Sequence, residues 1–133
     1  MIDIESEVMT LIYNAVHPTY DTAKFESELN LSPSSFPCVC VEEINNANNL
    51  SSADSGSNER HANVDYEVSI ITNDVSGKKR TAKAIFALID SAMLSHGFDR
   101  ITYQPLSLDN GTKYRLLLRY QAAVSQNNTI YRR

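Results

Sequence analysis

The sequence is short of the residues from which recognisable catalytic motifs are built. Of its 133 residues, only four are glycine and two are cysteine. So few glycines leave little material for a phosphate-binding loop. Neither such a loop, nor a nucleophile elbow, nor an H-E-x-x-H pattern occurs in the sequence. The sequence therefore does not predict an enzyme or a bound cofactor.

Excess positive charge and long apolar segments are also lacking. The net charge is -4 and the pI is about 5.3, so there is no general basic field to attract nucleic acid or an anionic membrane. No apolar run is long enough to cross a bilayer, and the acidic start MIDIESEV lacks the order of a signal peptide. We expect a soluble protein of the cytoplasm, and the length predicts a single domain over residues 1–133.

The two cysteines, Cys38 and Cys40, are separated by one residue. On a strand both side chains point to the same face, which is a poor geometry for an unstrained disulfide between them. A metal site shared with His61 is an alternative, but a structural zinc site needs four ligands and usually has wider cysteine spacing. A redox pair would need C-x-x-C at a helix start. The sequence therefore predicts two buried thiols and no metal site.

Two segments have the apolar periodicity of amphipathic helices. In residues 78–97, apolar side chains recur every three or four positions, and Asp90 falls on the opposite, polar face. Gly97 stands where a residue in the left-handed conformation ends a helix. The second pattern predicts a helix over residues 3–16, which ends before Pro18 because the residue preceding a proline avoids the helical conformation.

Four segments have the composition or alternation of β-strands. They cover residues 37–44, 64–70, 100–103 and 113–124. The Asn110-Gly111 pair predicts a tight hairpin turn between the last two. The predicted order is helix, strand, strand, helix, strand, strand. This order indicates an α+β fold, with a mostly antiparallel four-stranded sheet and both helices on one face.

A polar segment separates the first two predicted strands. Residues 45–63 are dominated by Asn, Ser and Asp and have almost nothing to bury. A connection of this length is long for a compact domain, and such loops are often disordered or become ordered on binding. We therefore predict a long polar loop at residues 45–63 that contacts a partner. The C-terminal residues 125–133 are predicted to form a mobile or partner-bound tail.

Charged and polar residues outside the predicted core form the candidate interaction surface. The triplet Lys78, Lys79 and Arg80 opposes the helix dipole, which indicates either a solvated first turn or a contact with an acidic partner. Arg115 and Arg119 lie on one strand face, about 13 Å apart by strand rise, and form a solvated face or a basic stripe. The full candidate set comprises Asn45, Asn48, Asp54, Glu59, Arg60, Lys78, Lys79, Arg80, Arg115 and Arg119.

Several stretches together resemble proteins of long-tailed bacteriophages. The first helix, the strand VDYEVSII at residues 64–71, the helix ending in Gly97-Phe98 and the strand YRLLLRY at residues 114–120 are similar in layout to tail terminator and tail-to-head joining (minor tail) proteins. The resemblance implies a structural protein without catalysis. It forms a six-fold ring of identical copies that caps the tail tube and joins it to the head connector.

The same resemblance implies the partners and the location. The partners are other copies of the chain, the tail tube protein and the head-completion or connector protein. DNA passes through the lumen of the ring without specific binding, and no membrane is involved. The location is the virion tail, reached after assembly in the host cytoplasm.

Two alternatives stay open from the sequence. Similar short α+β folds recur in head-completion, neck and tail tube proteins, so the chain is alternatively one of these components. The other alternative is a small cytosolic enzyme or ligand-binding domain with a pocket around His96, Tyr103 and Tyr114. That alternative requires convergent polar groups in a concavity.

Overall fold

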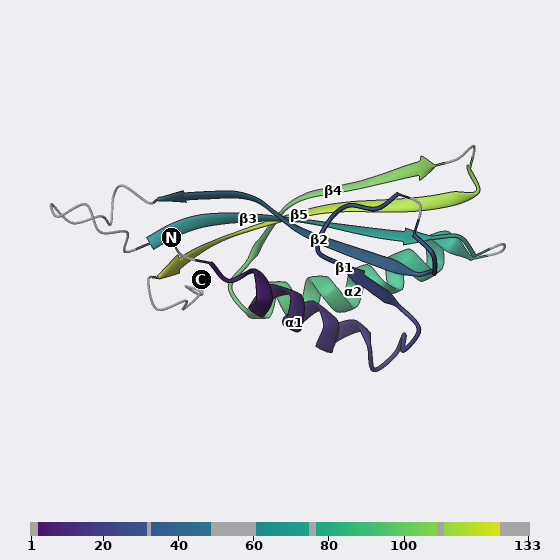
Figure 1. Cartoon of the computed structure of the whole chain (residues 1–133), viewed down its shortest axis with the longest axis horizontal. Helices are drawn as coiled ribbons and strands as arrows, with labels where there is room; N and C mark the ends of the chain where they lie inside the picture. The colour runs from purple at the N-terminus through teal and green to yellow at the C-terminus, as the bar shows by residue number, and fades with distance from the viewer. Residues whose placement is uncertain (1–2, 32, 49–60, 75–76, 109–110, 126–133) are drawn as a thin grey trace, which may run out of the picture.

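The chain forms a five-stranded mixed sheet with helices packed against it. The computed structural model describes residues 3–31, 33–48, 61–74, 77–108 and 111–125. Figure 1 shows both helices on the same side of the sheet. The elements of the described residues are, in chain order, α1 (Glu5–Val16), β1 (Lys24–Glu26), β2 (Cys38–Asn48), β3 (His61–Thr72), α2 (Lys78–Ser95), β4 (Asp99–Leu108) and β5 (Lys113–Ser125).

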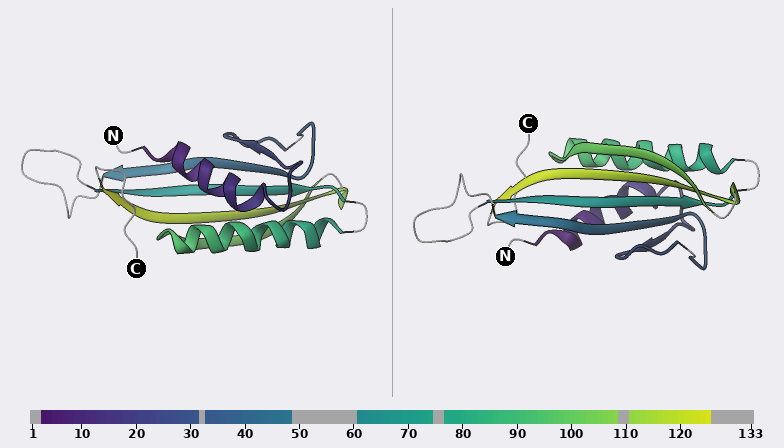
Figure 2. Two further views of the ribbon diagram at one scale, coloured as in Figure 1. Left: turned by 90° about the horizontal axis from the view of Figure 1, so that it is seen from below. Right: turned by 90° about the horizontal axis from the view of Figure 1, so that it is seen from above.

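The strands lie in the order β1-β2-β3-β5-β4. The pairs β2–β3, β3–β5 and β4–β5 are antiparallel, whereas β1 is parallel to β2. Figure 2 shows α1 beside β2 and β3, and α2 along β5 and β4. The two helices also pack against each other. Together they cover most of one face of the sheet.

Both predicted helices are confirmed. α1 ends at Val16, shortly before Pro18, but the expected reason does not hold, because His17, the residue before the proline, keeps helical φ and ψ angles of -56° and -39°. α2 ends just before Gly97, whose φ of 95° lies in the left-handed region that glycine adopts without a steric penalty. Neither helix is both long enough and apolar enough to span a membrane, and no other helix occurs among the described residues.

The predicted four-stranded, mostly antiparallel sheet is wrong, because the sheet has a fifth strand that pairs in parallel. The missed strand, β1, has only three residues, too few for an alternating pattern to be recognised. The observed order is helix, three strands, helix, two strands. β2 and β3 also extend beyond their predicted ends, so both ends of the predicted polar loop belong to strands, and residues 49–60 lie outside the described residues.

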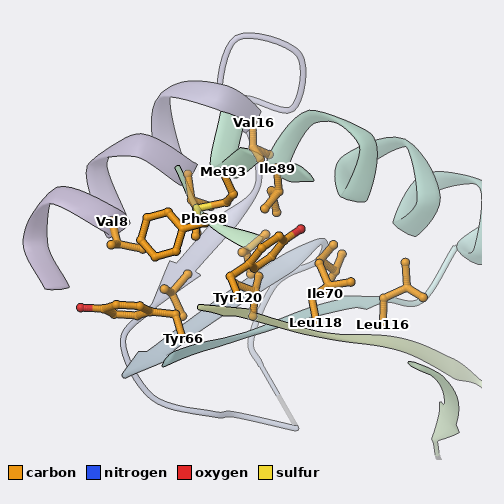
Figure 3. Packing of buried hydrophobic residues seen from close by; sticks show 14 of the residues in the cluster. Val8, Val16, Tyr66, Ile70, Ile89, Met93, Phe98, Leu116, Leu118 and Tyr120 are labelled. Atoms are coloured by element: carbon orange, nitrogen blue, oxygen red, sulfur yellow. The ribbon is translucent and has the colours of Figure 1, made fainter. Parts of the chain in front are cut away.

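The main core lies between the sheet and the helices. Alternate residues of β3 and β5 point toward α1 and α2, as expected for strands with one face covered (Figure 3). Each large aliphatic side chain buried in this way contributes roughly 1.5–3 kcal/mol to stability. The buried side chains labelled in the figure are Val8, Val16, Tyr66, Ile70, Ile89, Met93, Phe98, Leu116, Leu118 and Tyr120.

The opposite face of the sheet is also buried at one end. Cys38, Cys40 and Ile71 form a second apolar cluster, and Phe36 packs against it. The Lys113 Nζ of β5 donates a hydrogen bond to the backbone oxygen of Leu31 at 3.1 Å. The segment between β1 and β2 therefore lies over this end of the face. The prediction of two buried thiols is confirmed, since both cysteines are free and buried.

Candidate interaction surfaces

The basic triplet predicted from the sequence lies in the first turn of α2. Lys79 and Arg80 are exposed, and no acidic residue occurs in this turn. Lys78 is half-buried and borders a depression of about 430 Å³, together with Asp74 and Lys113. The turn therefore presents positive charge at the positive end of a helix dipole, where it is not neutralised within the turn itself.

The two arginines of β5 share one acidic partner instead of forming a free basic stripe. Arg115 is 9% exposed and donates hydrogen bonds to Ser69 Oγ at 3.0 and 3.1 Å and to Glu67 Oε1 at 3.3 Å. Arg119 donates to the other oxygen of Glu67, also at 3.3 Å. Arg115 is therefore part of the structure of this face, and Arg119 is the more accessible of the two.

The candidate residues of the polar segment are only partly described by the structure. Asn45 is exposed on β2 and donates a hydrogen bond to Asp65 Oδ2 at 3.4 Å. Asp54, Glu59, Arg60 and the predicted tail beyond Ser125 lie outside the described residues, as does the side chain of Asn48.

Both edges of the sheet leave strand backbone without a neighbouring strand in the part of the chain that the structure describes. β4 pairs only with β5, and β1 pairs only with Cys38–Cys40 of β2. The pairing of β2 with β3 and that of β4 with β5 each have a register shift at an isoleucine of the outer strand, Ile44 in β2 and Ile101 in β4. These isoleucines are 42% and 58% exposed. An open strand edge with exposed apolar side chains is a template for pairing with another chain.

A polar and aromatic cluster ties α2 to the edge strand β4. Asp90 accepts hydrogen bonds from Tyr120 Oη and from Arg100 Nη1, both at 2.9 Å. The Arg100 guanidinium lies 5.3 Å from the ring centre of Phe86, which packs edge-on against Tyr103 at 4.9 Å. Asp90 was predicted to lie on the polar helix face opposite the apolar one, and this is wrong, because its side chain is only 16% exposed and contacts two strands of the sheet. The periodicity of the helix sequence could not reveal these contacts, because the partners of Asp90 lie on the strands β4 and β5.

The pocket suggested around His96, Tyr103 and Tyr114 is not assembled. Tyr114 is buried beside Thr72, whose hydroxyl donates to the backbone of the first residue of α2. Tyr103 packs against the middle of α2, and His96 follows its last residue. A helix of 18 residues is about 27 Å long, so these side chains are spread along its whole length.

The buried thiols lie beside a carboxylate that the sequence did not associate with them. Glu26 of β1 pairs in register with Cys40, and the Cys38 thiol lies 3.9 Å from Glu26 Oε2 and 3.9 Å from the Cys40 thiol. The hydrogen bond between the thiols lowers the pKa of Cys40 to about 7, against the effect of burial, and raises the pKa of Cys38.

His61, the third ligand considered from the sequence, lies at the other end of the sheet. It begins β3, whereas the residue that pairs with Cys38 is Ile71. The ten residue steps from His61 to Ile71 span roughly 33 Å of strand. A metal site made of the two cysteines and His61 is therefore excluded by the register of the sheet.

The comparisons with known proteins give a match of fold. No protein-family model and no curated protein matches the sequence. The structure is similar to a chain of a solved structure described as "Virion of native gene transfer agent (GTA) particle", with a TM-score of 0.64 and 18% sequence identity. The match covers 88% of this chain and 93% of that chain. The two chains therefore share a fold over nearly their whole lengths.

Proposed function

We propose that the chain is a structural protein of a phage-like particle, which forms a ring that caps the tail tube and joins the tail to the head connector. The observation that carries this proposal is the shared fold with a chain of a gene transfer agent virion, over almost the full length of both. The specific role as a tail terminator is supported by the layout of the sequence, which resembles that family.

A ring of identical subunits needs two different surfaces that fit each other, because each copy contacts one neighbour on either side. The open edges of β2 and β4 meet this requirement, since they lie at opposite sides of the sheet and both offer unpaired backbone groups. Strand addition between them would extend the sheet from one copy to the next. Ile44 and Ile101 would supply apolar contacts at this junction.

The remaining partners in this role are the tail tube protein and the head-completion or connector protein. The basic first turn of α2, with Lys79 and Arg80 exposed, is a suitable contact for an acidic surface of one of them. The net charge of -4 favours passage of DNA through the ring without specific binding.

The test is the mass of the purified chain in solution, measured by light scattering, for the variants Ile44→Asp and Ile101→Asp. The wild type is expected to form a closed ring, and each variant is expected to lose it, because a charge at a buried strand junction is unpaired. A mixture of the two variants is expected to give dimers only, because one intact β2 edge and one intact β4 edge remain and can meet only once.

Leu94→Asp is the matched control. Leu94 is 47% exposed, similar to the two isoleucines, but lies on α2 and away from the strand backbone. If Leu94→Asp dissociates the assembly as completely as Ile101→Asp, the strand-edge contact is wrong. If the wild type stays monomeric at high concentration and does not join tail tubes, the ring itself is wrong.

A head-completion, neck or tail tube component is the second candidate, and the same fold match supports it, because the description of the matched structure names the whole particle and no position in it. Labelling the chain in intact particles and locating the label by electron microscopy distinguishes the two. A label at the junction of tail and head supports the terminator, and a label repeated along the tail supports a tube protein.

A further inference from the structure

We propose that Glu26, Cys38 and Cys40 form a binding site for a thiophilic divalent cation such as Zn²⁺. One ligand atom from each of these residues lies within 4.8 Å of the other two. Two sulfurs bound to one tetrahedral zinc ion at about 2.3 Å are about 3.8 Å apart. The two Sγ atoms are already 3.9 Å apart, so a bound ion would require little rearrangement of β2.

The strand pairing explains why these ligands converge although the cysteine spacing is unusual for zinc. Residues i and i+2 of a strand point to one face, which places both sulfurs on the same side of β2. Parallel pairing then sets Glu26 directly beside Cys40. The carboxylate therefore comes from the adjacent strand, and no pattern within residues 38–40 could reveal it.

The surroundings fit an ion held by two thiolates and one carboxylate. Lys24 Nζ lies 3.3 Å from Glu26 Oε1, which leaves Oε2 directed toward Cys38. A backbone hydrogen bond from Asn30 reaches the Cys40 sulfur. Such outer contacts orient metal ligands and raise their affinity. Three negative ligands are then balanced by a divalent ion and the adjacent Lys24.

The two sulfur ligands are buried, whereas the carboxylate ligand, Glu26, is half-buried. Cys38 and Cys40 are 0% and 2% exposed. A surface depression of about 490 Å³ is lined by residues 25–30, so Glu26, the carboxylate ligand, borders solvent. Three protein ligands leave the fourth tetrahedral position for water or an exogenous ligand. This site goes beyond the assembly role and does not depend on it.

The test is titration of reduced, chelator-treated protein with Co²⁺, which reports tetrahedral thiolate ligation by its absorption. The wild type is expected to bind one equivalent and to show a thiolate-to-cobalt charge-transfer band. Cys38→Ser and Cys40→Ser are each expected to lose this band. Glu26→Gln is expected to weaken Co²⁺ binding by at least roughly ten- to hundred-fold. Loss of an outer contact of a metal site already costs this much, and Glu26 is a direct ligand. Absence of the band in wild type at saturating Co²⁺ overturns the proposal.

Glu28→Gln is the matched control, because Glu28 is exposed and lies two residues from Glu26. It is expected to bind Co²⁺ as the wild type does. If Glu26→Gln also binds as the wild type does, the three-residue site is refuted. Zn²⁺ should also raise the Tm of the wild type and of Glu28→Gln but not that of the cysteine variants, with circular dichroism verifying that each variant is folded.

Discussion

The two faces of the sheet are buried by different kinds of structure. On one face, two amphipathic helices cover a continuous set of aliphatic and aromatic side chains. On the other, the segment between β1 and β2 covers a small apolar cluster of Cys38, Cys40 and Ile71, beside the polar cluster of Arg115, Ser69 and Glu67. A face covered by helices produces periodic apolar patterns in the sequence, whereas a face covered by an irregular segment produces almost no such pattern.

The largest expected effect comes from comparing Ile70→Ala with Ile71→Ala. These residues are neighbours on β3, point to opposite faces and are both 0% exposed. Truncation of a buried isoleucine costs about 2–5 kcal/mol, and the cost is highest where the surroundings cannot relax. We expect Ile70→Ala near the upper end of this range and Ile71→Ala near the lower end, measured by chemical denaturation. Equal losses would show that both covers are equally rigid.

The next effect tests the polar part of the second face. Arg115, whose side chain is 11% exposed, donates hydrogen bonds to Glu67 and Ser69. Glu67→Ala removes the first of these two partners and leaves Ser69. We expect a loss of about 1–3 kcal/mol, the cost of a buried polar group without its partner. Arg119→Ala is the control and should cost about 0–1 kcal/mol, because that side chain is 49% exposed. A larger loss from Arg119→Ala would contradict this assignment.

The smallest effect is a pH dependence of the helix-covered face. Burial, followed by the hydrogen bond to Asp90, raises the pKa of Tyr120 above its usual value of 10, although Arg100 opposes the shift. A raised pKa in the folded state contributes stability that is present below pH 10 and is lost as the pH rises above it. Unfolding free energies measured at several pH values should therefore fall above pH 10.

Tyr120→Phe is expected to cost about 1 kcal/mol at neutral pH, for one hydrogen bond, and to reduce the loss at high pH. Tyr66→Phe should act in the same direction, because burial and then Glu43 raise the pKa of Tyr66. An unchanged slope above pH 10 in both variants would show that other groups cause the alkaline loss.

Much of the helix-covered face could be predicted from the sequence. The helical spacing in α1 and α2 and the alternation in β3 and β5 reflect burial on one side only. Gly97 correctly marked the end of α2. The face was predictable because each element carries its own periodic pattern, independent of its partners.

The fifth strand and the ligand cluster could not be predicted in this way. β1 has three residues, all half-buried, and its role depends on which strand it meets. Glu26 is an ordinary charged residue until parallel pairing places it beside Cys40. Asp90 is similar, because its contacts with Tyr120 and Arg100 depend on the packing of α2 against two strands. Each of these features is set by tertiary contacts and not by local sequence.

The hydrogen bond between Lys113 and Leu31 joins positions 82 residues apart in the chain. Contacts of such separation form late, because a large loop must close before they are gained. We therefore expect the β2–β3 and β4–β5 hairpins to be complete while the thiols of Cys38 and Cys40 can still be alkylated. The time at which these two thiols become protected from alkylation, measured by pulse labelling during refolding, would then give the time of the final folding step.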